Sequence, residues 1–497
     1  MTSHADLRNR AGVGNAFPAS QPREGERLAD LFGTSEDSEV LLRAIYAEDR
    51  VAVPSEGGGY RVVELPVEGD RYPGISDSDP AAFVEECEIY EQFGVRPRGA
   101  KPLNRLLVPP HGEYRFPHLG SPAPKELRAP HYVAGPALEF PVGPVRGVAQ
   151  ESLYIGLVTS GEEVIDLYLL LWHKHRGIER RLEGLPVEKA LFFVERAEGL
   201  SAVANSWAFC RAVESVLGWT PPPAAENARA IALELERLYN HAAAVAALGQ
   251  ATGLSVGQAQ GEIALEQLLR LNAAVFGHRY LFGVLALGGV ARLPDMDALR
   301  ALLPRAREEL AHVLEALFST NSFLDRLEAA GVVAPEVAAR LGLVGPVARA
   351  SAADLDTRRD HPFGAYRDHR VDVPTRPAGD VLARMEVMDA ETRESLRLVE
   401  ELVAAGDEAP EAKGSAAAQS SGTLRAGSAL GWCESSRGEV LAWVDLDGNG
   451  RVRRARLRPA SVRNWRAFDD AARSRNVFTD VPIIEASFWL TVAGFAR

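Results

Sequence analysis

The most regular pattern in this chain is a helical spacing of apolar residues in its second half. Ile231, Leu235, Leu238, Ala242 and Val245 recur at steps of three and four, which predicts a helix over residues 225–248. Similar spacing predicts helices over 263–276, 305–329 and 385–405, the last one closed by Gly406. Antiparallel packing of these helices predicts a bundle-like core.

Shorter apolar runs predict strands on either side of this helical part. Residues 151–158 and 164–171 lie around Ser160-Gly161, which is a plausible hairpin turn, and residues 439–446 and 451–457 lie around Asp447-Gly448-Asn449-Gly450. Helical spacing over 81–93 stops at Gly94, as is typical of a helix C-terminus. The apolar and aromatic end of the chain, 481–497, is expected to be buried.

These patterns predict an α+β protein with three segments. Residues 1–35 are polar and glycine-rich, and we expect them to be loosely attached. Residues 36–135 form a small α+β domain that ends in a proline-rich connector over 97–136, and residues 136–497 form a mainly α-helical domain with peripheral β-hairpins. Within the second domain, the low-complexity segment 406–428 is expected to be a solvated loop.

Length, composition and charge narrow the function classes. A chain of 497 residues is longer than one domain with a single hydrophobic core, so we expect two or three domains. Its content of 46% hydrophobic and 25% charged residues is typical of a soluble protein. The formal net charge of −13 argues against nucleic acid as a main partner. The first residues lack the apolar core of a signal peptide, and no apolar run reaches about 18–20 residues. We therefore expect a cytoplasmic chain that reaches a membrane only through an embedded partner.

The sequence holds no self-contained cofactor motif. Cys87, Cys210 and Cys433 are far apart and no C-x-x-C is present, so an iron–sulfur cluster or zinc ion held by this chain alone is not expected. His173 and His175 have no second ligand cluster near them and are expected to be core or surface histidines. Helix packing is the expected role of Glu236 and His241.

Two charged segments leave their roles open. In the stretch 171–214, charged residues lie on both sides of the apolar run ALFFV. Some of these charges must therefore form ion pairs inside the fold, either at an active site or as a structural contact between segments. Asp354, Arg358, Arg359 and Asp360 have the composition of a solvated loop, and they could equally form the charged wall of a cleft.

Eight collinear segments resemble the large subunit shared by group 4 membrane-bound nickel–iron hydrogenases, of the formate hydrogenlyase type, and by complex I. They are GPVRGVAQES (143–152), KHRGIE (174–179), ER followed by AVE (195–214), LELERLYNHAAAVAALG (233–249), LGGVARLPD (287–295), GPVARASAADLDTRRDHPFGAY (345–366), VPTRPAGDVLARMEVMDAETRESLRL (373–398) and RGEVLAWV (437–444). Upstream, EECEIYEQFGVRPRGAKPLNRLLVP (85–109) resembles the small complex I subunit that is fused ahead of the large one in formate hydrogenlyase.

The resemblance implies partners and cofactors. It implies an iron–sulfur small subunit with a 4Fe–4S cluster, ion-translocating-type membrane subunits, and a position at the inner face of the cell membrane. It also brings quinone binding and NADH-linked electron transport into consideration.

The departures from the family pattern concern the sites. By the spacing E-R-x-C-x-x-C, the first metal-binding cysteine pair falls on Glu198 and Ser201, and the second falls on Thr491 and Gly494. Nickel–iron chemistry needs soft thiolates, which none of these residues supplies. The quinone-binding His and Tyr of the complex I version fall on Arg146 and Gly199.

We therefore expect the large-subunit component of a membrane-associated, hydrogenase-4-like or complex-I-like oxidoreductase that has lost the nickel site. In this hypothesis Arg146, Glu198, Gly199 and Ser201 line a cavity, and Glu198 is the proton-carrying carboxylate. Electrons from a partner's 4Fe–4S cluster would reduce a quinone or another acceptor there. The alternative is a non-catalytic scaffold that holds the iron–sulfur subunit to ion-translocating membrane subunits.

Overall fold

A computed structural model describes residues 22–23, 25–36, 39–49, 59–65, 67–99, 103, 106, 137–146, 151–171, 173–408, 424–473 and 475–497. The chain divides into two compact units, Met1–Arg128 and Ala129–Arg497. The sequence places the domain boundary a few residues later, at 135/136. Most of the proline-rich connector over 97–136 lies outside the described residues.

The first unit is a small α+β structure. Strands β1 (Glu26–Glu36), β2 (Glu39–Glu48) and β3 (Tyr60–Leu65) form an antiparallel sheet in the order β1-β2-β3, and β4 (Arg71–Pro73) pairs in parallel with β5 (Arg96–Arg98). Helix α2 (Phe83–Phe93) ends at Gly94, whose φ of 74° is left-handed, as expected from the sequence. Apolar residues of α2 and the sheet, such as Leu31, Tyr46 and Phe93, share one core.

Strand β1 corrects the prediction for residues 1–35. Residues 1–21 lie outside the described part, but Glu26–Glu36 pairs along its length with β2, and Leu28, Leu31 and Phe32 are buried. Residues 28–34 are all buried, including the polar Asp30 and Thr34, so polar composition did not mark an exposed segment here.

The second unit combines long helices with two three-stranded antiparallel sheets. Its helices are α3 (Ile178–Leu182), α4 (Val187–Glu195), α5 (Ala202–Leu217), α6 (Pro223–Ala251), α7 (Ser255–Phe276), α8 (Met296–Phe318), α9 (Asn321–Leu327), α10 (Pro335–Leu341), α11 (Gly345–Arg349), α12 (Thr357–Asp360), α13 (Val381–Glu408), α14 (Ala460–Asn464), α15 (Arg466–Arg473) and α16 (Val481–Phe488). Its strands are β6 (Leu138–Val142), β7 (Tyr154–Ser160), β8 (Glu163–Leu170), β9 (Leu285–Ala286), β10 (Gly289–Val290), β11 (Gly427–Ser435), β12 (Gly438–Leu446) and β13 (Val452–Arg458).

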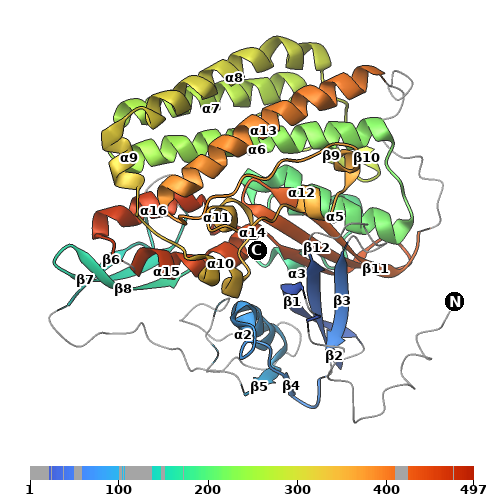
Figure 1. Cartoon of the computed structure of the whole chain (residues 1–497). Helices are drawn as coiled ribbons and strands as arrows, with labels where there is room; N and C mark the ends of the chain where they lie inside the picture. The colour runs from blue at the N-terminus through green and yellow to red at the C-terminus, as the bar shows by residue number, and fades with distance from the viewer. Residues whose placement is uncertain are drawn as a thin grey trace. The chain divides into compact units, whose positions relative to one another are not determined.

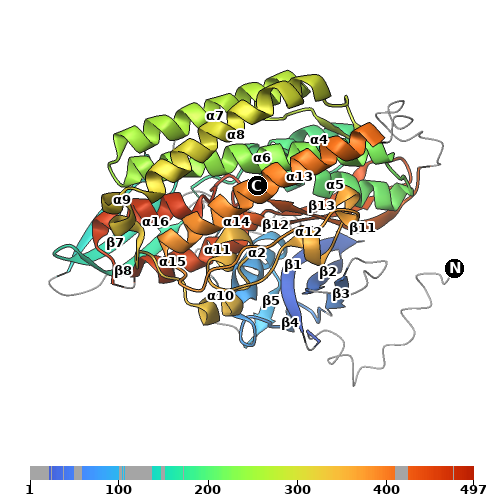
Figure 2. The same cartoon turned by 45° about the horizontal axis from the view of Figure 1, so that its top comes forward.

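Four long helices, α6, α7, α8 and α13, form one layer of this unit, and α5 with the sheet β11-β12-β13 forms the next (Figures 1 and 2). Helix α6 lies at the centre, and nearly every residue from Ala228 to Leu248 is buried. A helix that is buried on all sides needs partners for its charged residues, and α6 carries Arg229, Glu234, Glu236 and Arg237 in this buried stretch. The α+β fold expected from the sequence is confirmed, as are both predicted hairpins.

Two predicted helices differ in extent from the observed ones. The pattern over 305–329 is two helices, α8 and α9, because the chain leaves the helix at Ser319 and Thr320 is extended. Helix α13 runs through Gly406 to Glu408. A Cβ at Gly406 would lie 3.1 Å from Met296 Cε, so this glycine serves close helix packing rather than termination.

The segment predicted as a solvated loop, 406–428, is only partly described. Residues 409–423 lie outside the described part, while β11 begins at Gly427. Strand β11 was not predicted, because its first residues are small and polar. Gly431 allows it to lie directly on α5, since a Cβ there would come within 2.0 Å of the Ala208 carbonyl oxygen.

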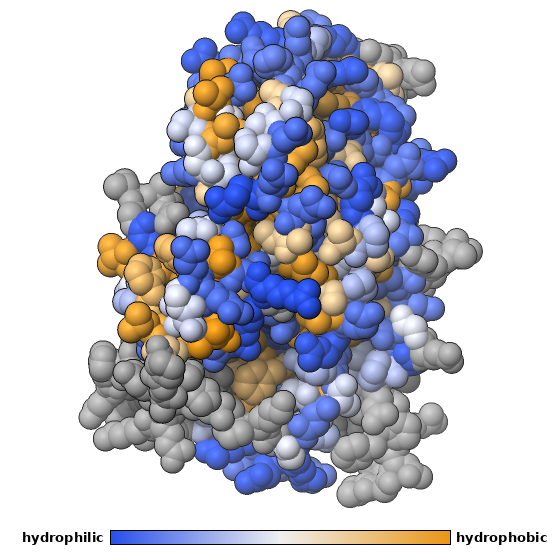
Figure 3. Space-filling model, turned by 60° about the vertical axis from the view of Figure 1, so that its left-hand side comes forward, coloured by the Kyte–Doolittle hydropathy of each residue, from blue (hydrophilic) through white to orange (hydrophobic). Residues whose placement is uncertain are grey.

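Several apolar side chains of the β6-β7-β8 sheet are exposed. Leu138 is 73% and Phe140 51% exposed, and the Phe140 ring contacts Phe478. The face drawn in Figure 3 shows apolar patches within a mainly hydrophilic surface. Among the described residues, no helix has the length and apolar character needed to cross a membrane.

Candidate functional site

Glu198 and Ser201 lie where the chain passes from α4 to α5. The backbone of Glu198 is extended, with φ −145° and ψ 98°, and residues Gly199–Ser201 form a 3-10 turn directly before Ala202 begins α5. The Ser201 amide donates to the Glu198 carbonyl oxygen at 2.9 Å. Both side chains are at most 1% exposed, so the polar groups of this turn require partners inside the protein.

The C-terminal segment supplies partners for Glu198. Helix α16 ends at Phe488, and the next residue, Trp489, has a left-handed backbone. The chain then turns so that Thr491 Oγ1 donates to Glu198 Oε1. Ser461 Oγ, from α14, donates to the same oxygen at 3.1 Å. The Gly494 amide donates to Thr491 Oγ1 at 3.2 Å, and a Cβ on Gly494 would lie 3.4 Å from Glu198 Cδ.

Arg437 joins Ser201 to this group. It lies in the tight turn between β11 and β12, and its Nη1 donates to Ser201 Oγ at 3.0 Å. Its Nη2 donates to Asn240 Oδ1 at 3.0 Å, and its Nε lies 4.0 Å from Glu198 Oε1. The side chains of Arg437 and Glu198 are each 1% exposed. The four positions at which the resemblance places metal-binding cysteines therefore belong to one connected cluster, in which Ser201 and Glu198 lie next to Arg437, and Thr491 and Gly494 join through Glu198.

Further carboxylates surround this cluster. Glu236 of α6 accepts from the amides of Val203 and Ala204, at 2.7 and 3.1 Å, at the start of α5. Burial raises the pKa of Glu236 to about 8, against the effect of these two hydrogen bonds. Glu151 accepts from the amides of Val492 and Ala493, and burial raises its pKa as well.

The other two predicted site residues have different surroundings. Arg146 forms a bidentate ion pair with Glu485 of α16, at 2.7 and 2.5 Å. Gly199 is partly buried beside Glu198, and a Cβ there would meet the Phe282 ring at 3.5 Å. The structure thus brings together Glu198, Ser201, Thr491 and Gly494, while the guanidinium group of Arg146 is held by Glu485.

Sequence reasoning missed Arg437 and Ser461, which complete the cluster. Arg437 stands in a polar turn, Ser435-Ser436-Arg437-Gly438, a composition that usually marks an exposed hairpin. Nothing local shows that this turn is buried, so the only signal was its place in the segment RGEVLAWV that carries the resemblance.

A second buried network lies behind this turn. Arg237, Arg349 and Arg358 are fully buried and pair with Glu234, Glu391, Asp356 and Glu434. His241 Nε2 lies 3.0 Å from Glu391 Oε2. Burial alone would raise the pKa of Glu391, but Arg349, His241 and Arg237 together lower it to about 2. Burial lowers the pKa of His241 itself, so the contact with Glu391 is a hydrogen bond inside this network, in addition to the helix packing that we expected.

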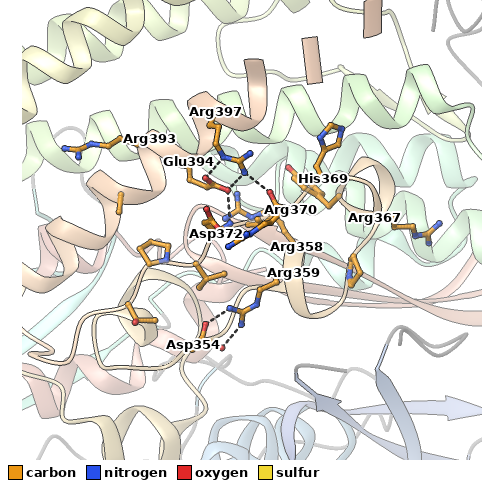
Figure 4. Close-up of a pocket in the computed structure, with 17 residues that line it drawn as sticks. Asp354, Arg358, Arg359, Arg367, His369, Arg370, Asp372, Arg393, Glu394 and Arg397 are labelled. Atoms are coloured by element: carbon orange, nitrogen blue, oxygen red, sulfur yellow. Dashed lines mark hydrogen bonds and ion pairs between the residues drawn. The ribbon is translucent and has the colours of Figure 1, made fainter. Parts of the chain in front are cut away.

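The charged segment at Asp354–Asp360 forms part of a cleft. Asp354, Arg358 and Arg359 line a pocket together with residues 362–375 and one side of α13 (Figure 4). Of the two roles left open by the sequence, the charged wall is the one observed. Among the described residues, no group of three or more His, Cys, Asp or Glu side chains is placed to hold a metal ion. His173 and His175 are exposed.

Comparisons with known proteins show what this chain is similar to. Residues 252–497 match the family model described as respiratory-chain NADH dehydrogenase, 49 kDa subunit. Formate hydrogenlyase subunit 5 of Escherichia coli (strain K12) is 28% identical over 94% of this chain and 84% of its own length. The carbon monoxide-induced hydrogenase of Rhodospirillum rubrum is 29% identical over 69% of this chain and 95% of its own length. NADH-quinone oxidoreductase subunit 4 of Thermus thermophilus is 31% identical over 52% of this chain and 64% of its own length.

The fold also has a counterpart among solved structures. A chain of the membrane-bound sulfane sulfur reductase, an archaeal respiratory membrane complex, matches with a TM-score of 0.68 and 23% identity. The match covers 74% of this chain and 100% of that one.

Proposed function

Because residues 252–497 match the family model of the 49 kDa subunit of respiratory-chain NADH dehydrogenase, we propose that the chain is the large-subunit component of a membrane-associated oxidoreductase complex. Its partners in this proposal are an iron–sulfur small subunit and ion-translocating-type membrane subunits, and its position is at the inner face of the membrane. The observation that carries the proposal is one buried cluster in which Arg437 contacts Ser201 and Glu198, Thr491 donates to Glu198, and the Gly494 amide donates to Thr491.

We further propose that this complex does not use nickel at this position. The four residues offer one carboxylate, two hydroxyl groups and one glycine, whereas nickel–iron centres need thiolates. A guanidinium group lies 4.0 Å from Glu198, so the carboxylate already has a cationic neighbour. The hydroxyl groups of Thr491 and Ser461 also donate to Glu198, which favours a protein-only cluster.

In the catalytic form of the proposal, electrons from a 4Fe–4S cluster of the partner reduce a quinone or a related acceptor beside this cluster. A two-electron reduction of a quinone consumes two protons, and Glu198 is the residue that we propose to deliver one of them. The Ser201 hydroxyl group accepts from Arg437 and keeps its own hydrogen for donation to an acceptor, whereas the Thr491 hydroxyl group already donates to Glu198. The family's quinone contacts are not repeated, since Gly199 has no side chain and Arg146 pairs with Glu485.

The non-catalytic alternative also has a specific observation in its favour. Glu198, Thr491, Ser461 and Arg437 are hydrogen-bonded or paired with one another and with other residues of this chain. A self-satisfied cluster stabilises the junction of α5, α14 and the C-terminal segment without any ligand. In that case the chain is a scaffold that joins the iron–sulfur subunit to membrane subunits.

The two forms are separated by assays on the purified complex. We expect no stoichiometric nickel by elemental analysis, and quinone reduction with formate or NADH that is lost in Glu198→Gln while the complex still assembles. The control is Glu266→Gln, which changes an exposed ion pair on α7 and should keep full activity. Absence of redox activity in the wild-type complex supports the scaffold, and stoichiometric nickel contradicts both forms.

A further inference from the structure

The open pocket beside α13 shares no lining residue with the Glu198 cluster. It has a volume of about 840 Å³, which is within the range of about 300–1,000 Å³ that is typical of small-ligand sites. Its lining comes from residues 354–359, from the segment 362–375, and from Ala390, Arg393, Glu394 and Arg397 of α13 (Figure 4). Neither the Glu198 cluster nor the proposed redox role uses it.

The charge of this lining is opposite to the charge of the chain. The whole chain has a formal net charge of −13. The pocket is lined by six arginines and His369 but only three carboxylates, those of Asp354, Asp372 and Glu394. The arginines are Arg358, Arg359, Arg367, Arg370, Arg393 and Arg397. A local excess of guanidinium groups in an acidic protein favours an anionic ligand.

The base of the pocket is held rigid by buried ion pairs. Arg358 is 1% exposed and donates to both oxygens of Glu234 at 3.0 Å and to Asp356. The hydroxyl group of Tyr366, another lining residue, donates to the same Glu234. Higher up, Arg397 donates to Glu394, Glu401 and the Arg370 carbonyl oxygen. These groups are pre-organised, so a ligand would not have to order them.

Three other arginines remain available to a ligand. Within the described part of the chain, Arg367 forms no ion pair, and its side chain is exposed. The side chains of Arg370 and Asp372 are 85% and 60% exposed, so this ion pair is weak and an incoming anion can replace the carboxylate. The side chain of Arg393 is 75% exposed and that of its partner Asp389 is 13% exposed, so the Arg393 guanidinium group can contact an anion in addition to this carboxylate.

These arginines are spread along the pocket. In Figure 4, Arg393 and Arg367 stand at opposite ends and Arg370 lies between them. The lining also includes the apolar groups of Val371, Val373 and Pro374. A ligand that uses all of these features has an apolar body and more than one anionic group.

We propose that this pocket binds a soluble organic anion with two or more phosphate groups, of the nucleoside diphosphate class. Arg370 and Arg393 would contact the phosphates, because guanidinium groups bind phosphate oxygens in a bidentate way. Val371, Val373 and Pro374 would contact the apolar body. The proposal does not depend on the chemistry at Glu198.

The test is calorimetric titration of ADP and of inorganic pyrophosphate into the full chain and into the assembled complex. We expect saturable ADP binding to both that weakens as salt is raised, and weaker binding of pyrophosphate, which lacks the apolar body. Arg370→Glu and Arg393→Glu should each weaken ADP binding about tenfold or more, since each removes a charge-assisted hydrogen bond and adds a repulsive charge.

The matched control is Arg270→Glu, which reverses an exposed i,i+4 pair on α7 just as Arg393→Glu does on α13. It should leave ADP binding unchanged. Equal loss in this control, or no binding of ADP to the chain, overturns the proposal. Binding to the isolated chain but not to the complex also overturns it, because the pocket would then belong to an acidic surface of a partner subunit.

Discussion

The hydroxyl group of Thr491 donates a hydrogen bond to the carboxylate of Glu198, across a separation of 293 positions in the sequence. This contact ties the C-terminal segment to the start of α5. Because Arg437 lies 4.0 Å from the same carboxylate and donates to Ser201, the junction consists of three chain segments around one buried charge pair. A buried pair of this kind is costly to break, since the remaining charge is left without its partner.

We predict that Glu198→Gln lowers the free energy of unfolding by about 2 kcal/mol and Arg437→Met by about 3–5 kcal/mol. The double variant should lose clearly less than the sum, because the second substitution removes a group that the first has left unpaired. Urea unfolding midpoints of the four proteins measure this coupling. Strict additivity would show that the two side chains do not interact.

Gly431→Ala is expected to destabilise the chain by more than about 2 kcal/mol, because the added Cβ would overlap the Ala208 carbonyl oxygen and push β11 away from α5. Gly448→Ala in the next hairpin is the matched control, since a Cβ there has no neighbour within 4 Å. The midpoints of thermal unfolding of both variants and the wild type measure this difference in stability. Equal midpoints would mean that β11 does not pack on α5 as closely as observed.

Glu179 ties α3 to β13 and to the C-terminal segment, accepting from the Leu457 amide and from Arg497 Nε, each at 2.9 Å. Burial alone would raise its pKa, but Arg497, Arg456 and Arg454 lower it from 4.5 to about 2. It therefore contributes stability that is present above pH 4.5 and is lost as the pH falls towards 2, amounting to about 3 kcal/mol.

Glu179→Gln should consequently be less stable at pH 7 and should lose less stability than the wild type between pH 5 and pH 2. Urea midpoints over this range measure the difference. Glu188→Gln, on the exposed side of α4, should follow the wild-type curve. A Glu179→Gln curve parallel to the wild type would contradict the ionic clasp.

For Glu236 we predict that the free energy of unfolding depends on pH in the opposite direction. Burial raises its pKa from 4.5 to about 8, so the folded protein keeps a proton that the unfolded chain releases. The stability contributed by this proton is present below pH 4.5 and is lost as the pH rises to 8. Glu236→Gln should show a smaller loss of stability than the wild type between pH 5 and pH 8, measured by urea unfolding. Identical slopes would show that Glu236 is ionised throughout this range in the folded protein.

Local pattern predicted much of the fold. The period of apolar residues identified α6, α7 and most of α13, and turn residues located both hairpins, because these features depend on near neighbours in the chain. The break between α8 and α9 and the strand β1 were not predicted. In both places the sequence does not show whether a polar residue faces solvent or packs against another element. The family resemblance identified which four positions to compare, but not where their side chains point.

The amino-acid sequence by itself determined most of the long helices, both hairpins, the family resemblance and the absence of sulfur at Glu198, Ser201, Thr491 and Gly494. Tertiary structure alone decided that these residues meet, that Arg437 stands among them, and that Arg146 pairs with Glu485 instead. The physical reason is the sequence separation over which each effect acts. Apolar periodicity and turn chemistry depend on residues a few positions apart, whereas the partners of a buried charge depend on how segments hundreds of residues apart pack together.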